Sequence, residues 1–223
     1  MIDFIDRGVL PFILRLYDTV GYLGVAFAVA LETIVAPIPS EVILPMAGWK
    51  VSQSAADPSV LEPLTGLSWN LPLAVGLATI GSVAGALVGY YIGAWGGRPL
   101  LDRYGRYVGI GADDLDRAHR WFDRWGGWAV GLGRMIPLVR TFVSYPAGIS
   151  RMSLPRFLVF TTLGSVPWNF ALIYAGFLLG ENYPVIAETI KPYEYVIYAI
   201  VIALVVLLAA YFYLSRRRRR ADG

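Results

Sequence analysis

The sequence predicts an all-α polytopic membrane protein. The expected fold is two inverted repeats, each a re-entrant broken-helix hairpin plus a spanning helix, with an extra C-terminal spanning helix. Composition leads to this class, because 57% of the 223 residues are hydrophobic and 16% are charged. The mean hydropathy of +0.56 fits a multi-spanning membrane protein better than a soluble domain. Long uncharged runs and short proline-interrupted segments in both halves support the same class.

The uncharged runs fall into two length classes. A spanning helix needs about 20 apolar residues, whereas shorter apolar segments are more typical of re-entrant or interfacial structure. The runs long enough to span are 63–97, 157–180 and 195–215, and the shorter segments are 19–31, 41–49, 125–133 and 141–150.

These runs predict a single membrane domain over residues 1–223. In chain order it comprises an amphipathic N-terminal helix (1–20), repeat 1 (21–97), a cytoplasmic amphipathic segment (98–125), repeat 2 (126–180), a C-terminal span (194–215) and a basic cytoplasmic tail (216–223).

Arginine placement predicts the orientation in the membrane. Six arginines lie in the segment 98–125, whereas the loops 50–71 and 181–194 hold one lysine each. The positive-inside rule therefore makes the arginine-rich segments and the C-terminus cytoplasmic. The run Arg216–Arg220 follows a hydrophobic span, which favours an anchor to anionic lipids over nucleic-acid binding. The arginine placement does not decide on which side of the membrane the N-terminus lies.

The two halves of the chain resemble one another. Residues 17–24 parallel 122–129, and small-residue exits follow at 45–48 and 145–148. The chain crosses the membrane an odd number of times between the two units, so we expect the units to have opposite orientations in the membrane. Such paired, interrupted segments indicate a transporter-like binding site near the membrane midplane. The expected breaks of the hairpins are Pro37, Pro39, Pro137, Pro146 and Gly148.

Charged residues occur at these breaks, and charge at membrane depth is expensive, so each is a candidate for function. The first hairpin carries Glu32 and Glu41, and the second carries Arg134 and Arg140. Guanidinium groups bind phosphate through a planar fork of donors, and broken helices add free N–H groups. The predicted ligand is therefore an anion, a phosphate with an apolar group attached.

Facing hairpins would bring the acids of one repeat to the arginines of the other. Burial favours the protonated form of a carboxylate, and a nearby guanidinium favours the ionised form. An anion that occupies the arginines would let the acid take up a proton, which is a minimal scheme for proton-linked transport. The alternative is a static buried cluster that fixes packing.

Other residues have more limited roles. Ser40, Thr141, Trp168 and Asn169 are candidates for lining the site, although a helix–helix hydrogen bond is the favoured interpretation of Asn169. Glycines at every fourth position of 81–97 predict close helix packing, internal or at a dimer interface. Cysteine is absent, and His119 lies among charged residues without a partner for a metal. We expect no metal, no cofactor and no catalytic residue.

Together these residues resemble the DedA family of membrane proteins, also called SNARE-associated or VTT-domain proteins, over residues 21–180. The family implies two re-entrant hairpins in an inverted arrangement. Its bacterial members are implicated in proton-dependent recycling of undecaprenyl phosphate, and its eukaryotic relatives in phospholipid scrambling. The matching residues are Glu32, Pro37-Ile38-Pro39-Ser40-Glu41, Ala47-Gly48, Gly133-Arg134-x-x-Pro137-x-x-Arg140, Pro146-Ala147-Gly148 and Trp168.

The resemblance implies that Arg134 and Arg140 are essential, together with acids matching Glu32 and Glu41. Many members have Pro-Gly-Asp at a longer distance from the first glutamate, so the equivalence of Glu41 stays open. The leading hypothesis is a flippase of the bacterial cytoplasmic (inner) membrane for undecaprenyl or another polyprenyl phosphate. A phospholipid scramblase, a small-anion carrier and a non-transporting envelope factor are the alternatives. The expected partners are the anionic lipid and membrane lipids, with no nucleic acid and a homodimer left open.

Overall fold

Helices make up the regular structure of the part that a computed structural model describes, residues 10–34, 40–97, 112–137 and 139–182. An isolated bridge joins Leu61 and Ser68. The predicted all-α class is confirmed for this part, which lies almost wholly in one compact unit, residues 1–181. The helices are α2 (Leu10–Ile34), α3 (Ser40–Ala56), α4 (Leu71–Ile92), η2 (Gly93–Gly97), α6 (Ala112–Gly133), α7 (Val139–Phe142), α8 (Ser144–Ile149), α9 (Leu154–Leu179) and η4 (Gly180–Asn182).

Three described helices are long and apolar enough to cross a membrane: Pro11–Ile34, Leu71–Gly97 and Leu154–Leu179. The last two confirm the predicted spans at 63–97 and 157–180, with the first of these beginning later because residues 57–70 form a loop. The predicted C-terminal span at 194–215 and the tail at 216–223 lie outside the described residues.

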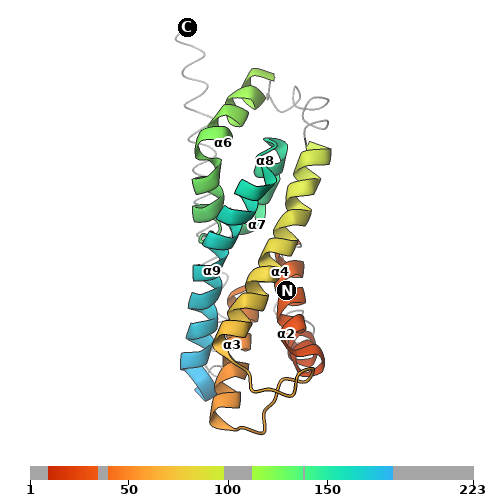
Figure 1. The fold of residues 1–223 in the computed structure, drawn as a ribbon, viewed down its shortest axis with the longest axis vertical. Coiled ribbons are helices and arrows are strands. Elements are labelled where there is room, and N and C mark those ends of the chain that lie inside the picture. Colours follow the sequence, from red (N-terminus) through yellow and green to blue (C-terminus); the bar gives the residue numbers. More distant parts are fainter. Residues whose placement is uncertain (1–9, 35–39, 98–111, 138, 183–223) are drawn as a thin grey trace. The chain divides into compact units, whose positions relative to one another are not determined.

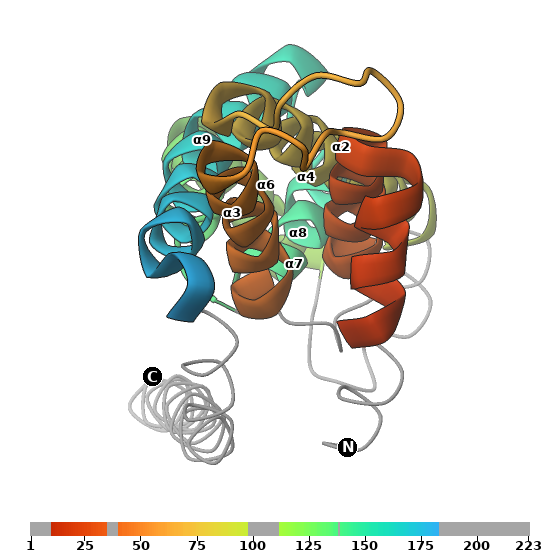
Figure 2. The ribbon, with the colours of Figure 1, turned by 90° about the horizontal axis from the view of Figure 1, so that it is seen from below.

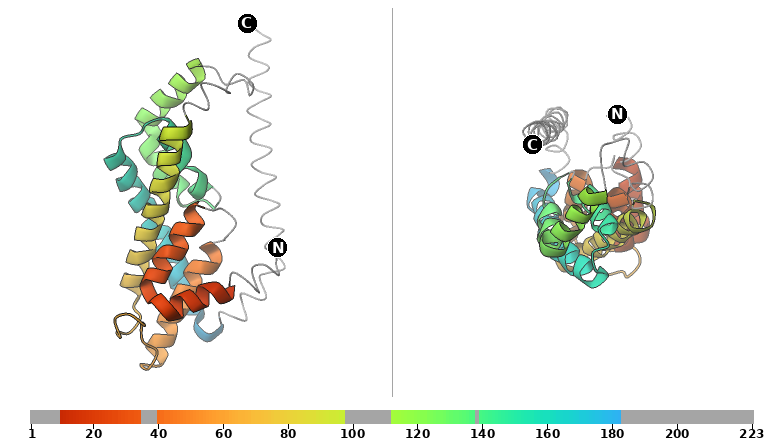
Figure 3. Two further views of the ribbon diagram at one scale, coloured as in Figure 1. Left: turned by 90° about the vertical axis from the view of Figure 1, so that its right-hand side faces the viewer. Right: turned by 90° about the horizontal axis from the view of Figure 1, so that it is seen from above.

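The element α2 consists of two helical segments joined by a kink at Gly21, where φ is 56° and ψ is −130°. The kink falls at the boundary expected between the N-terminal helix and repeat 1. It is visible within the red helix in Figure 3. Residues 22–34 beyond it rise about 20 Å at 1.5 Å per residue, which is less than the hydrocarbon core of about 30 Å.

The loop before α4 holds this bend in place. The Glu62 carboxylate accepts hydrogen bonds from the backbone N–H groups of Tyr22 (3.2 Å) and Thr65 (2.7 Å) and from the Thr65 hydroxyl (2.6 Å). Burial alone would raise the pKa of Glu62, but these hydrogen bonds outweigh it and lower the pKa below its ordinary value. An ionised carboxylate therefore caps the segment of α2 that continues to the site.

The helices α4 and α9 run along most of this unit, as Figure 1 shows. Beside them, α2 and α3 occupy the lower half of the view, and α6, α7 and α8 occupy the upper half. Seen from below, α3 lies against α9 and α2 against α4 (Figure 2). The ends of these two groups of helices therefore meet at the middle of α4 and α9.

The second half contains the predicted interruption. Helix α6 ends at Gly133 and α7 begins at Val139, so the chain is non-helical around Pro137. Pro146 and Gly148 lie inside α8 instead of at a break, since a proline in the first turn of a helix removes no required donor. The next break is at Arg151, with φ of 50°. The expected breaks at Pro37 and Pro39 lie outside the described residues.

Helix α6 also differs from the expectation of a surface segment that ends at residue 125. It runs unbroken through Gly126 and Gly127 to Gly133. Gly127 packs directly on the Phe160 ring of α9, where a Cβ would come within about 3 Å of the ring. Packing against α9 therefore outweighs the low helix propensity of the two glycines.

The glycines of α4 allow other helices to approach its backbone. A Cβ on Gly81 or Gly85 would collide with backbone carbonyls of α2. The predicted packing role is confirmed, and the partners are internal.

Two contacts between a short and a long helix have the same pattern. In each contact, a glycine of the first helix faces a backbone carbonyl of the second, and a glycine of the second faces a backbone carbonyl of the first. The pairs are Gly48 with Ile173 and Gly176 with Pro45, joining α3 to α9, and Gly148 with Tyr90 and Gly93 with Tyr145, joining α8 to α4 and to the start of η2. Each short helix thus packs on the long helix of the other half.

We predict that Gly81→Ala lowers the thermal unfolding midpoint in detergent, because overpacking a tight contact costs about 1–3 kcal/mol. Gly76→Ala on the same helix is the matched control, since nothing lies within 4 Å of its added Cβ. The control should be neutral or stabilising, and equal midpoints for the two variants would contradict the contact.

Candidate functional site

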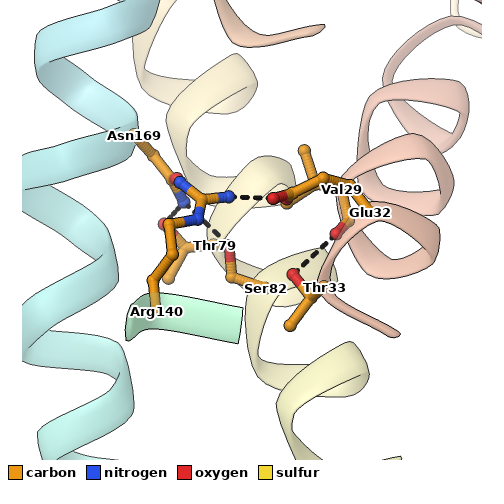
Figure 4. Close-up of polar contacts among 7 residues, drawn as sticks. All are labelled: Val29, Glu32, Thr33, Thr79, Ser82, Arg140 and Asn169. Carbon is orange, nitrogen blue, oxygen red and sulfur yellow. Dashed lines mark hydrogen bonds and ion pairs between the residues drawn. The ribbon is translucent and has the colours of Figure 1, made fainter. Parts of the chain in front are cut away.

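A buried ion pair joins the two halves of the chain. The Arg140 Nη2 of α7 donates to the Glu32 Oε2 of α2 at 2.5 Å, across 108 positions of sequence. Both side chains are buried, and Figure 4 shows them pointing toward one another beside α4. The prediction that an acid of the first half meets an arginine of the second is confirmed for this pair.

Among the described residues, the second arginine has no carboxylate as an ion-pair partner. Arg134 follows the end of α6, is 3% exposed, and its Nη2 donates to the Ser144 hydroxyl at 2.6 Å. Its Nε has no hydrogen-bond partner among the described residues. The charges of Arg140 and Glu32 both act on Arg134. Two buried guanidinium groups therefore share one buried carboxylate, which leaves a positive charge uncompensated among them.

The other predicted acid lies apart from this cluster. Glu41 is in the first turn of α3, and its side chain is exposed. Its charge acts on Glu32, but it forms no ion pair with a described residue. Ser40 beside it is buried. The structure thus brings three of the four predicted charged residues together.

The remaining candidate residues surround Arg140. Thr141 is its buried neighbour, and the ring of Trp168 in α9 lies 5.9 Å from the Arg140 guanidinium carbon. Asn169 Nδ2 donates to the hydroxyls of Thr79 and Ser82, both at 3.2 Å, and so ties α9 to α4 (Figure 4). This confirms the interpretation of Asn169 as a helix–helix hydrogen bond.

Sequence reasoning missed the hydroxyl groups of the site. Ser144 binds Arg134, and Thr79 and Ser82 bind Asn169. For Thr79 and Ser82 a signal was available in the sequence. They are three residues apart within an apolar run, which places both hydroxyls on one face of a spanning helix.

The arrangement of the two buried arginines is suited to binding an anion. Within the described ranges, no group of three or more His, Cys, Asp or Glu residues could hold a metal ion. The arginines supply fixed positive charge away from water, where a charge-assisted hydrogen bond is stronger than at the surface. An anion could bind here by taking the place of Glu32 at Arg140.

Comparison with known proteins identifies the family. The VTT domain matches residues 58–178, more than half of the chain. This chain belongs to the VTT-domain family. The resemblance to DedA-type proteins in the motifs is thereby confirmed, and no solved structure matches the chain.

Relatives of this VTT-domain protein are bacterial. Undecaprenyl phosphate transporter A of Bacillus subtilis (strain 168) is 34% identical over 77% of this chain and 78% of its own. The protein of the same name from Staphylococcus aureus is 32% identical over 83% and 87%. An alkaline phosphatase-like protein of Lactococcus lactis subsp. cremoris is 36% identical over 84% of each chain. Two of these relatives are thus named as transporters and one as phosphatase-like.

We predict that Glu32→Gln and Arg140→Gln each destabilise the protein by about 3–5 kcal/mol, because each leaves a buried charge unpaired. The double variant should recover most of that loss in a double-mutant cycle of unfolding in detergent.

The control cycle uses the Asp18–Lys50 pair, whose nitrogen and oxygen lie 2.7 Å apart with the Asp18 side chain 59% exposed. The Lys50 side chain is 13% exposed, but water screens the exposed Asp18 carboxylate, so this pair should couple by at most about 1 kcal/mol. Equal coupling energies in the two cycles would contradict the burial of the Glu32–Arg140 pair.

Proposed function

We propose that this protein carries a polyprenyl phosphate, with undecaprenyl phosphate as the leading candidate, across the bacterial inner membrane. The observation that carries the proposal is the cluster of two buried arginines around one buried carboxylate. Isolated charge at this depth is expensive, and an anionic ligand would compensate the remaining positive charge. Relatives named as undecaprenyl phosphate transporters support the choice of anion.

The proposed architecture is a pair of inverted repeats, 21–97 and 126–180, each with a broken hairpin. The duplicated glycine contacts of α3 on α9 and α8 on α4 support it. So do the short segment of α2 beyond Gly21 and the break between α6 and α7. In this arrangement the arginines lie near the midplane, and the C-terminus is cytoplasmic.

Proton coupling follows from competition for Arg140. A phosphate that binds Arg140 would displace Glu32 and leave its carboxylate buried without a guanidinium partner. An unpaired carboxylate away from water is stabilised by taking up a proton. The nearby negative charge of Glu41 favours the same step. Release of the lipid would return Arg140 to Glu32 and expel the proton.

The proposed activity is transport and not hydrolysis, unlike the activity in the name of the Lactococcus lactis relative. A metal-dependent phosphatase needs a ligand cluster for its ions, and the described residues contain none. Liberated inorganic phosphate in a lipid-phosphate assay with purified protein would contradict this part of the proposal.

Transport by purified protein in liposomes tests the function. We predict that Arg134→Gln, and Arg140→Gln combined with Glu32→Gln to avoid an unpaired charge, each slow the movement of labelled undecaprenyl phosphate at least tenfold. Loss of a hydrogen bond to a charged group costs about 1.5–3 kcal/mol, which is roughly tenfold or more. Arg124→Gln, at an exposed position of α6, is the control and should transport normally.

Two outcomes distinguish the alternatives. Undiminished transport without the buried arginines would overturn the mechanism. Comparable movement of a zwitterionic phospholipid, independent of a proton gradient, would identify a scramblase in place of a selective transporter.

A further inference from the structure

Three buried polar atoms lack a hydrogen-bond partner within the described part of the chain: Arg134 Nε, Thr161 Oγ1 and Trp168 Nε1. A buried polar group without a partner costs about 1–3 kcal/mol, and lipid offers no water to satisfy it. Each of the three carries a hydrogen that it can donate. Such atoms therefore indicate a partner beyond the described residues, and a bound ligand can be that partner.

Two of these donors lie on α9, and the third belongs to a residue that packs against it. Thr161, Gly164 and Trp168 are spaced three and four residues apart, which places them along one side of the helix. Gly164 lies directly against the Arg134 side chain, where an added Cβ would come within 2.8 Å of the Arg134 Cβ. The Arg134 side chain thus begins beside α9, at a level between Thr161 and Trp168.

The free hydroxyl of Thr161 differs from the hydroxyls of two other buried threonines. Thr33 and Thr79 each donate to the backbone carbonyl four residues earlier, at 2.8 Å. That bond is the ordinary way in which a threonine in an apolar helix satisfies its hydroxyl. Thr161 lies in the same kind of helix, is 0% exposed, and does not make this bond. Its proton remains available to a ligand.

The indole N–H of Trp168 is close to the arginine pair. The Arg140 guanidinium lies over the Trp168 ring at 5.9 Å, so a phosphate bound by Arg140 would lie beside the indole. Trp168 therefore has two features of a binding residue, a contact to the charged group and a free donor.

We propose that Trp168 Nε1 and Thr161 Oγ1, together with Arg134 Nε, donate to the oxygens of the headgroup phosphate. The inference rests on the proposed function and concerns its specificity. A phosphate monoester presents three terminal oxygens, whereas the diester of a phospholipid presents two. A ring of donors from both the arginines and α9 can use all three oxygens, and so favours a monoester.

Binding of farnesyl phosphate to the purified protein, with farnesol as the neutral comparison, tests the proposal. Trp168→Phe and Thr161→Val each remove one donor and keep most of the side-chain volume. Each should weaken farnesyl phosphate binding about tenfold, the lower range for a hydrogen bond to a charged group. Neither should change binding of farnesol.

The thermal midpoint without ligand separates a binding role from a structural one. Removal of an unsatisfied donor should leave the midpoint unchanged or raise it, while affinity falls. The controls are Trp128→Phe, at a side chain that is 60% exposed, and Thr162→Val, which is half-buried; both should bind normally.

Wild-type affinity in Trp168→Phe and Thr161→Val would overturn the inference and leave the proposed function standing. A parallel loss of midpoint and affinity would also overturn it, because it would indicate a packing role. If the wild-type protein binds farnesyl phosphate no better than farnesol, the proposed function fails, and this inference fails with it.

Discussion

The hydrogen-bonded ion pair between Glu32 and Arg140 is the constraint on which the arrangement of the helices depends. Removing two charges from water costs several kcal/mol per ion, and only close, well-oriented contact compensates for that cost. The bend at Gly21, capped by Glu62, directs α2 toward the pair, and the interruption after Gly133 presents Arg140 to it. The bend and the interruption of the helices thus both position the side chains of this one buried ion pair.

Close backbone packing holds this contact between rigid partners. Lipid chains are as apolar as leucine, so helices in a membrane associate through van der Waals packing and interhelical hydrogen bonds. The glycines of α4 and α9 permit that packing, and Asn169 adds hydrogen bonds to Thr79 and Ser82. A fixed frame around an unequal number of buried positive and negative charges is suited to binding an anion and releasing it.

The sequence predicted the features that follow from the cost of charge and the length of apolar runs. Arg134 and Arg140 stood out because they lie in an apolar region, and the runs that became α4 and α9 were long enough to span. The contact that holds the bend at Gly21 was not predicted, because Glu62 is 40 residues from Tyr22 in the chain. Thr161 gave no signal, because a threonine in a helix ordinarily satisfies its own hydroxyl.

The most direct test of the account is whether a phosphate displaces Glu32 from Arg140. Infrared difference spectra of protein with isotope-labelled glutamate can record the protonation of carboxyl groups when farnesyl phosphate is added. The account predicts loss of an ionised carboxylate signal and uptake of a proton, both absent in Glu32→Gln. Saturable binding of farnesyl phosphate with an unchanged Glu32 carboxylate signal would contradict it.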